Sequence, residues 1–220
     1  MNKYLNITNL LIIINTVIFL TLFALENDGL AIDSNILVSF GAINTEKIVL
    51  YNQWWRLIAG MFLHLDIIHL AINMVSLYII GSIVQQTYSN TAYLFAYLAT
   101  GITGSLLSLF LSPYFLLVGA SGAIFGLFGL LVGHYAIYGS IPSMSRQSVI
   151  SNFWIIIGLN TLIGFSITIV DISSHIGGML SGFIFGYLTS RFKKYGIMIY
   201  GCIFIICAIF LYFKIMIDNF

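Results

Sequence analysis

The sequence has very little charge for its length. Only 7% of its 220 residues are Asp, Glu, Lys or Arg, whereas 60% are hydrophobic and the mean hydropathy is +1.04. A soluble domain carries about 25% charged residues. This chain is too apolar to cover a water-facing surface, and we expect it to lie in a lipid bilayer.

Excess charge of one sign is also missing, and cysteine is scarce. Eight basic residues against seven acidic ones leave a net charge of +1, which offers no cationic stripe for phosphates, so nucleic acid is not an expected partner. Cys202 and Cys207 share one apolar stretch. A disulfide there would join nothing, so we expect two small buried apolar side chains. Without a His-Glu-x-x-His motif, no metal or cofactor is expected.

Long apolar runs are what the sequence does contain. A membrane-spanning helix needs about 20 apolar residues, and hydropathy predicts seven, near residues 8–25, 66–86, 91–112, 119–137, 151–170, 173–190 and 196–217. No linker or repeat divides the chain, and its longest polar stretch is about 26–56. We therefore predict an all-α polytopic helical bundle, a single transmembrane domain over 1–220, with one large loop.

The few charges predict the orientation, because Lys and Arg accumulate on the cytoplasmic side of a membrane. With the N-terminus inside, the inner segments hold only basic residues, namely Lys3, Arg146, Arg191, Lys193 and Lys194. The outer segments then hold most of the acids. The N-terminus is accordingly expected in the cytoplasm and the C-terminus outside.

Polar residues at membrane depth are the informative ones, since an unsatisfied polar group in a bilayer is costly. His69 and Asn73 fall on the second predicted span, Ser121 on the fourth and His175 on the sixth. Each even-numbered span descends from the outer face, and Ser121, His69 and His175 lie near the start of theirs. These spans should bring their polar groups to one depth, with Asp66 capping the second.

Spacing refines this set. His69 and Asn73 are four apart and share a helix face, whereas His64 and His69 are five apart and should point away from each other. Glycines also recur at steps of three or four on the fourth and sixth spans, as Gly122, Gly126, Gly129 and Gly133 and as Gly178, Gly182 and Gly186. Small residues at this period let helix backbones touch in lipid, which should bring Ser121 toward His175.

Such a pair has a chemical interpretation. A serine hydroxyl becomes nucleophilic when a neighbouring base accepts its proton, and histidine serves as that base and later as the acid for the leaving amine. The Ser121 backbone N–H and the His69 and Asn73 side chains are candidate donors to the oxyanion. No carboxylate is placed to complete a triad, so we predict a dyad.

These residues resemble the rhomboid family of intramembrane serine proteases. The resemblance rests on Trp55-Arg56, on the segment from His64 to Asn73, on Gly119-Ala-Ser121-Gly122 and on His175-Ile-Gly-Gly178. Each fragment alone is weakly specific, but together and in this order they are a strong signal. The resemblance covers about 8–190, a six-helix core, and leaves 196–217 as an extra C-terminal span of the six-plus-one kind.

The resemblance implies roles for these positions. Ser121 would be the nucleophile and His175 its base, with His69, Asn73 and the Ser121 amide stabilising the oxyanion. Gly119 would keep the chain close to the scissile bond, Phe125 would stack on the imidazole, and Trp55 with Arg56 would hold the outer loop. It also implies single-pass transmembrane proteins as substrates and a bacterial plasma membrane as the location; the oligomeric state stays open.

Other interpretations remain for several of these residues. Ser121 taken alone is more often a helix-packing residue, and a catalytically silent rhomboid-like adaptor that binds transmembrane helices is the alternative to a protease. His64 is expected to be a loop or interface residue that supports the site, and His134 to be structural or interfacial. The aromatic residues Trp54, Tyr88 and Tyr93 are expected as interface anchors.

Overall fold

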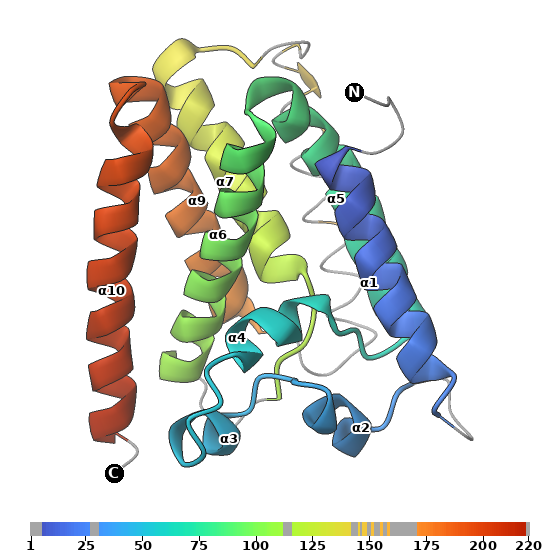
Figure 1. The fold of residues 1–220 in the computed structure, drawn as a ribbon. Coiled ribbons are helices and arrows are strands. Elements are labelled where there is room, and N and C mark those ends of the chain that lie inside the picture. The colour runs from blue at the N-terminus through green and yellow to red at the C-terminus, as the bar shows by residue number, and fades with distance from the viewer. Residues whose placement is uncertain are drawn as a thin grey trace.

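The computed structural model is a helical bundle with a cluster of short helices at one end (Figure 1). It describes residues 6–26, 31–111, 116–141 and 171–218, together with 145, 147, 148, 151, 155 and 158. The long helices are α1 (Ile7–Phe23), α5 (Ile67–Thr87), α6 (Asn90–Leu111), α7 (Ser121–Tyr138), α9 (Ile172–Phe192) and α10 (Gly196–Asp218). The short ones are α2 (Ser34–Ser39), α3 (Thr45–Val49), α4 (Arg56–Ala59) and the 3-10 turn η1 (Gly60–Phe62).

The long helices agree with six of the seven predicted spans to within a few residues. Four of them, α5, α6, α7 and α10, are long and apolar enough to cross a membrane, and α1 is a shorter apolar helix. The helix α9 has 21 residues and is not among those four. The fifth predicted span, 151–170, lies outside the described residues apart from three isolated positions. A polytopic helical bundle is thus confirmed, whereas the count of seven stays a prediction.

Side chains at the helix starts explain where several helices begin. The carboxylate of Asp66 accepts a hydrogen bond from the His69 backbone N–H at 2.8 Å, and Asp171 accepts one from the Ser173 N–H at 2.9 Å. Such caps satisfy N–H groups that the first helical turn leaves unpaired. The predicted cap at Asp66 is confirmed, and both caps fix the height of a nearby histidine.

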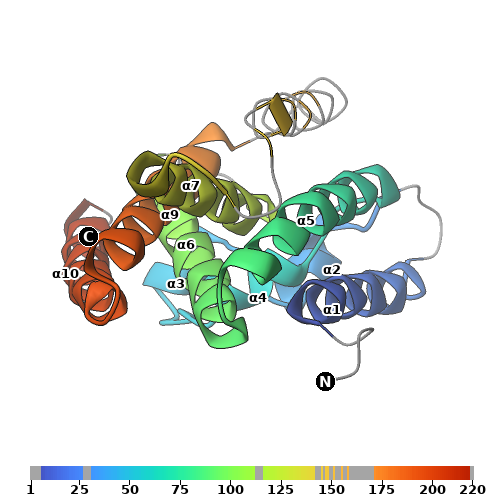
Figure 2. The same ribbon diagram turned by 90° about the horizontal axis from the view of Figure 1, so that it is seen from above.

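The core lies among α5, α6, α7 and α9, where α7 and α9 make the most extensive contact between any two helices of the described chain. Seen from above, α1 and α10 lie at opposite sides of the bundle, α1 beside α5 and α10 beside α9 (Figure 2). Tyr93 is fully buried, and its hydroxyl lies 3.2 Å from the Thr8 hydroxyl of α1. The expectation that Tyr93 is an interface anchor was therefore wrong.

The helix α10 has one packed face and one open face. Tyr200 is buried, with its hydroxyl 2.7 Å from that of Ser181 on α9. Cys202 and Cys207 are instead exposed, so the expectation that both are buried was wrong. An apolar helix can leave such residues exposed because its outer face needs no covering in a bilayer.

Candidate active site

Two helix starts bring a serine hydroxyl to a histidine ring. Ser121 is the first residue of α7, and His175 lies in the first turn of α9. The Ser121 Oγ and the His175 Nε2 are 2.8 Å apart. Ser121 is 9% exposed and His175 is partly buried, so the pair is sheltered by the bundle without being sealed in it.

Glycines make this contact possible, because α7 and α9 touch backbone to backbone. A Cβ at Gly178 would collide with the Gly122 carbonyl, and one at Gly182 with the Gly126 carbonyl. At Gly122 itself, a Cβ would stand 2.6 Å from the Oγ of Ser174, the neighbour of His175. The predicted mating of the two glycine ridges is confirmed, and larger residues would push the hydroxyl and the imidazole apart.

An aromatic ring fixes the imidazole from one side. Phe125 lies one turn below Ser121 on α7, and its ring stacks on that of His175 with centroids 4.4 Å apart and an interplanar angle of 18°. The predicted stacking is thus present. Phenylalanine offers no hydroxyl here, so Phe125 supports the imidazole by ring contact and not by a hydrogen bond.

A third helix places a second imidazole beside the serine. Gly119 has φ +120°, and a Cβ built on it would lie 2.7 Å from the Nε2 of His69 and 3.9 Å from the Oγ of Ser121. His69 and Ser121 therefore face one small space that only glycine leaves open. Asn73 is one turn deeper on α5, 2% exposed, and its Nδ2 donates to the His69 carbonyl at 2.9 Å.

His64 is closer to the site than the spacing predicted. Its ring is fully buried and lies edge-on to the His69 ring, with centroids 5.1 Å apart. The expectation that the two rings point apart was wrong, because α5 begins only at Ile67 and a helical period does not apply before it. Burial, and then the nearby His69, lower the pKa of His64 well below its usual range.

The loop that carries Trp55 and Arg56 is tied down by hydrogen bonds. Arg56 is 4% exposed, and its Nη1 donates to the carbonyls of Val38 and Ala42 at 2.6 and 3.0 Å. Trp55 is 52% exposed, and its ring packs on Gly41, where a Cβ would meet it at 2.5 Å. Arg56 therefore holds the loop internally while Trp55 faces outward.

Backbone contacts then connect this loop to the serine, and sequence reasoning missed them. Ile43 and Leu117 exchange two N–H to carbonyl bonds of 3.0 Å each, and the Gly119 N–H donates to the Gly60 carbonyl at 3.0 Å. The segment entering α7 is thus pinned at two points before Ser121. The sequence does not predict such a bridge, because it is formed by backbone groups that do not depend on the residue type.

His134 lies away from this site, at the other end of α7. Its Nδ1 is 3.1 Å from the Ser190 hydroxyl and 3.3 Å from the Tyr88 hydroxyl, which favours the structural one of its two expected roles. Among the residues that the structure describes, no group of three His, Cys, Asp or Glu side chains could hold a metal ion.

Comparisons with known proteins point to one family. A family model described as the Rhomboid domain matches residues 51–192. The chain is 40% identical to Rhomboid protease GluP of Bacillus subtilis over 164 residues, which are 74% of this chain and 31% of that protein. It is 37% identical to RHOMBOID-like protein 6, mitochondrial, of Arabidopsis thaliana over 74% of this chain and 52% of that protein. It is 31% identical to Rhomboid-like protease 3 of Toxoplasma gondii over 68% and 59%. The chain thus spans from about a third to somewhat over half of these relatives.

Proposed function

Because this chain belongs to the rhomboid family, we propose that it is an intramembrane serine endopeptidase that works through a Ser121–His175 dyad. The observation that carries the proposal is the 2.8 Å contact between the Ser121 Oγ and the His175 Nε2, made between two helices at one end of the bundle. Relatives that carry the word protease in their names support the reaction class.

In the first step, the Ser121 hydroxyl donates its hydrogen bond to the His175 Nε2. As Oγ attacks the carbonyl carbon of the scissile bond, its proton passes to that nitrogen, and the carbonyl π electrons move onto the oxygen. Phe125 keeps the imidazole plane in place during this transfer. The protonated His175 then gives its proton to the leaving nitrogen, and the peptide bond breaks.

The oxyanion formed in this step needs donors. The Ser121 backbone N–H is one of the unpaired groups at the start of α7. His69 and Asn73 are the side-chain donors, His69 through the Nε2 that faces the space beside Gly119. Donors held in advance cost no reorganisation when the charge develops.

Hydrolysis of the acyl-enzyme completes the reaction. His175 accepts a proton from water, the hydroxide oxygen attacks the ester carbonyl, and the proton returns to Oγ as the bond to Ser121 breaks. Water must therefore reach the dyad from the end of the bundle that carries α2, α3 and α4 (Figure 1).

The substrates proposed are single-pass transmembrane proteins. A peptide bond within a helix has its carbonyl engaged and shielded, so a substrate must unwind near the site before attack. Segments with Gly or Pro near the end of their span unwind at the lowest cost. The protein is a multi-pass membrane protein, and we place it in a bacterial plasma membrane with the N-terminus cytoplasmic and the C-terminus outside.

The decisive test is the Ser121→Ala variant, assayed on a model transmembrane substrate in liposomes. Cleavage should be abolished while the folded fraction is unchanged. Ser105→Ala is the matched control, because that serine is also buried in a long helix and its Oγ donates to the Gly101 carbonyl of its own helix. Ser105→Ala should cleave normally.

A fluorophosphonate probe adds a readout that needs no substrate. The wild type should be labelled at Ser121, and His175→Ala should be labelled hardly at all because the hydroxyl then lacks its base. Cleavage by Ser121→Ala would refute the dyad. A wild type that binds substrates without cutting them would instead identify the silent adaptor.

A further inference from the structure

A groove on the surface of the bundle lies away from the candidate active site. It has a volume of about 600 Å³ and runs between α10 and α6, reaching the segment that enters α4. Its walls are apolar side chains, with Ile102 and Leu106 on α6 and Ala208 and Ile209 on α10. At its loop end it is bounded by Trp54 and Leu57.

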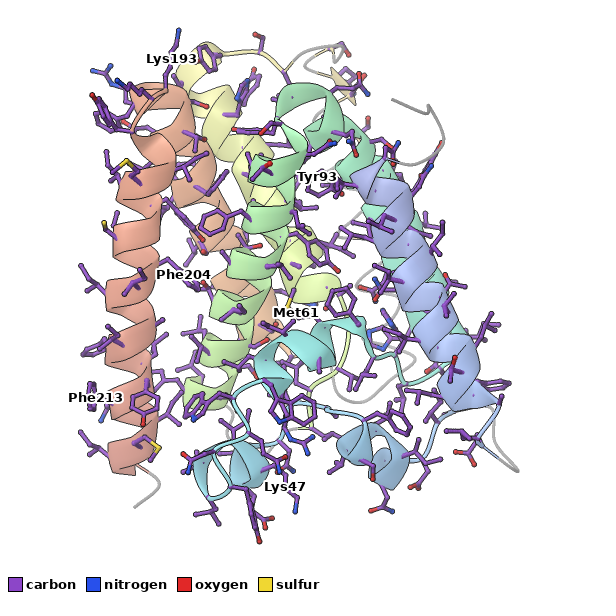
Figure 3. All side chains as sticks on the ribbon, in the orientation of Figure 1. Lys47, Met61, Tyr93, Lys193, Phe204 and Phe213 are labelled. Carbon is purple, nitrogen blue, oxygen red and sulfur yellow. The ribbon has the colours of Figure 1, made fainter. Side chains whose placement is uncertain are left out.

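The length of the groove matches one leaflet of a bilayer. On α10 its lining runs from Phe204 to Phe213, two residues that Figure 3 labels along that helix. Nine steps of 1.5 Å make about 14 Å, close to half of a hydrocarbon core that is about 30 Å thick. Both helices are long and apolar enough to cross a membrane, so the groove lies at hydrocarbon depth.

The two ends of the groove differ in a way that suits a lipid. At the loop end, the rings of Trp54 and Tyr212 pack with centroids 4.9 Å apart, and Trp and Tyr are the residues that favour the headgroup level. The lining on α10 ends at Phe204, and one turn before it the buried Tyr200 joins α10 to Ser181 of α9. The groove thus starts at the interface and ends within the leaflet.

We propose that this groove binds the acyl chain of a phospholipid from the leaflet that faces the loop-bearing end. A transmembrane helix crosses both leaflets of a hydrocarbon core about 30 Å thick, whereas the groove lining on α10 extends over only about 14 Å. A flexible hydrocarbon chain from one leaflet fits a groove of this length. Its apolar walls offer nothing to a polar ligand.

The bound chain would act as part of the support of the loop. It would rest against Trp54 and Leu57, which directly flank Trp55 and Arg56 in the sequence. The extra C-terminal helix α10 thereby gains a role, because it supplies the outer wall that turns one face of α6 into a lipid site.

Quenching of Trp54 fluorescence tests the proposal without any proteolysis assay. The full chain with Trp55→Phe and Trp154→Phe keeps Trp54 as its single tryptophan. In vesicles of phosphatidylcholine with brominated acyl chains, its fluorescence should be strongly quenched. Ala208→Phe should remove most of this quenching by filling the groove. If the Ala208→Phe variant does not fold, Ala208→Leu takes its place and should reduce the quenching to an intermediate level.

The control is Ile206→Phe, since Ile206 is 66% exposed on α10 and is not part of the groove lining. It should leave the quenching unchanged. Native mass spectrometry of the wild type in mild detergent should show retained phospholipid that Ala208→Phe loses. Equal quenching and equal lipid retention in all variants would overturn the proposal. A dimer that disappears with Ala208→Phe while lipid retention stays constant would also overturn it, in favour of a second copy.

Discussion

At the scale of single residues, the site depends on groups that do no chemistry themselves. The Ser121 hydroxyl meets His175 because Phe125 covers one face of the imidazole and Gly122 leaves room for Ser174 beside it. In the same way, the missing side chain of Gly119 leaves room for the His69 ring. A reacting pair misplaced by about 1 Å can lose on the order of a hundredfold in rate, so these contacts matter as much as the dyad.

Asn73 offers the sharpest test at this scale. If it donates to the oxyanion, Asn73→Ala should lower kcat by about 10- to 100-fold with little change in KM, because the interaction forms only in the transition state. The measurement is steady-state cleavage of a transmembrane substrate. A change confined to KM would assign Asn73 to substrate binding.

The chain provides a matched control for Asn73 on another helix. Asn15 of α1 is fully buried, and its Nδ2 donates to the carbonyl four residues earlier at 2.8 Å, the same local bond that Asn73 makes at 2.9 Å. Asn15→Ala should therefore lower stability to a similar degree while leaving kcat close to that of the wild type.

Sequence reasoning found these residues because polar groups are rare in so apolar a chain. Ser121, His69, Asn73 and His175 stood out at membrane depth, and the structure gathers all four at one end of the bundle. His64 was misjudged, since its position before α5 depends on the loop and not on a helical period. The catalytic roles themselves stay predictions.

At the scale of elements, the pair of α7 and α9 is the support on which the site is built. Their glycines alternate so that each backbone lies in the groove of the other, with Gly182 facing the Gly126 carbonyl and Gly186 facing the Leu130 carbonyl. This packing was predictable, because a repeat of three and four residues is visible in the sequence.

Gly182→Ala tests the element directly. The added methyl would collide with the α7 backbone, so we expect a loss of about 1–3 kcal/mol in the free energy of unfolding, as overpacking usually costs. Unfolding in mixed detergent micelles gives the value. Gly201→Ala on α10 is the control, because no atom of the described residues lies within 4 Å of its Cβ position, and it should leave the stability nearly unchanged. Equal effects of the two variants would contradict the close packing of α7 on α9.

The loop between α1 and α5 shows where sequence reasoning stops. The sequence predicted one large polar loop with aromatic residues, but not α2, α3 and α4, nor the bridge between Ile43 and Leu117. Short helices carry too few residues to set a period, and backbone bridges form between segments distant in sequence. Within this loop, the sequence analysis anticipated only the role of Arg56, which the resemblance assigned to holding the loop and whose side chain donates to two carbonyls.

At the scale of the whole molecule, the bundle has two chemically different ends. The short helices lie at one end, near Lys47, whereas Lys193 lies at the other, as Figure 3 shows. The helices α7 and α9, which carry Ser121 and His175 in their first turns, both begin toward the end with the short helices (Figure 1). Arg191 and Lys194 flank Lys193 in the sequence. Because basic residues collect on the cytoplasmic side, this polarity supports a site that opens to the exterior.

Cysteine labelling can test that orientation in intact bacterial cells. In a background of Cys202→Ser and Cys207→Ser, the exposed residues Glu46 and Lys194 are replaced one at a time by cysteine. A membrane-impermeant maleimide should label Glu46→Cys in intact cells and Lys194→Cys only after permeabilisation, because in the proposed orientation the positive end faces the cytoplasm. The reverse pattern would place the dyad at the inner face. Labelling of both residues from outside would contradict their placement at opposite ends of the bundle, since they would then share one side of the membrane.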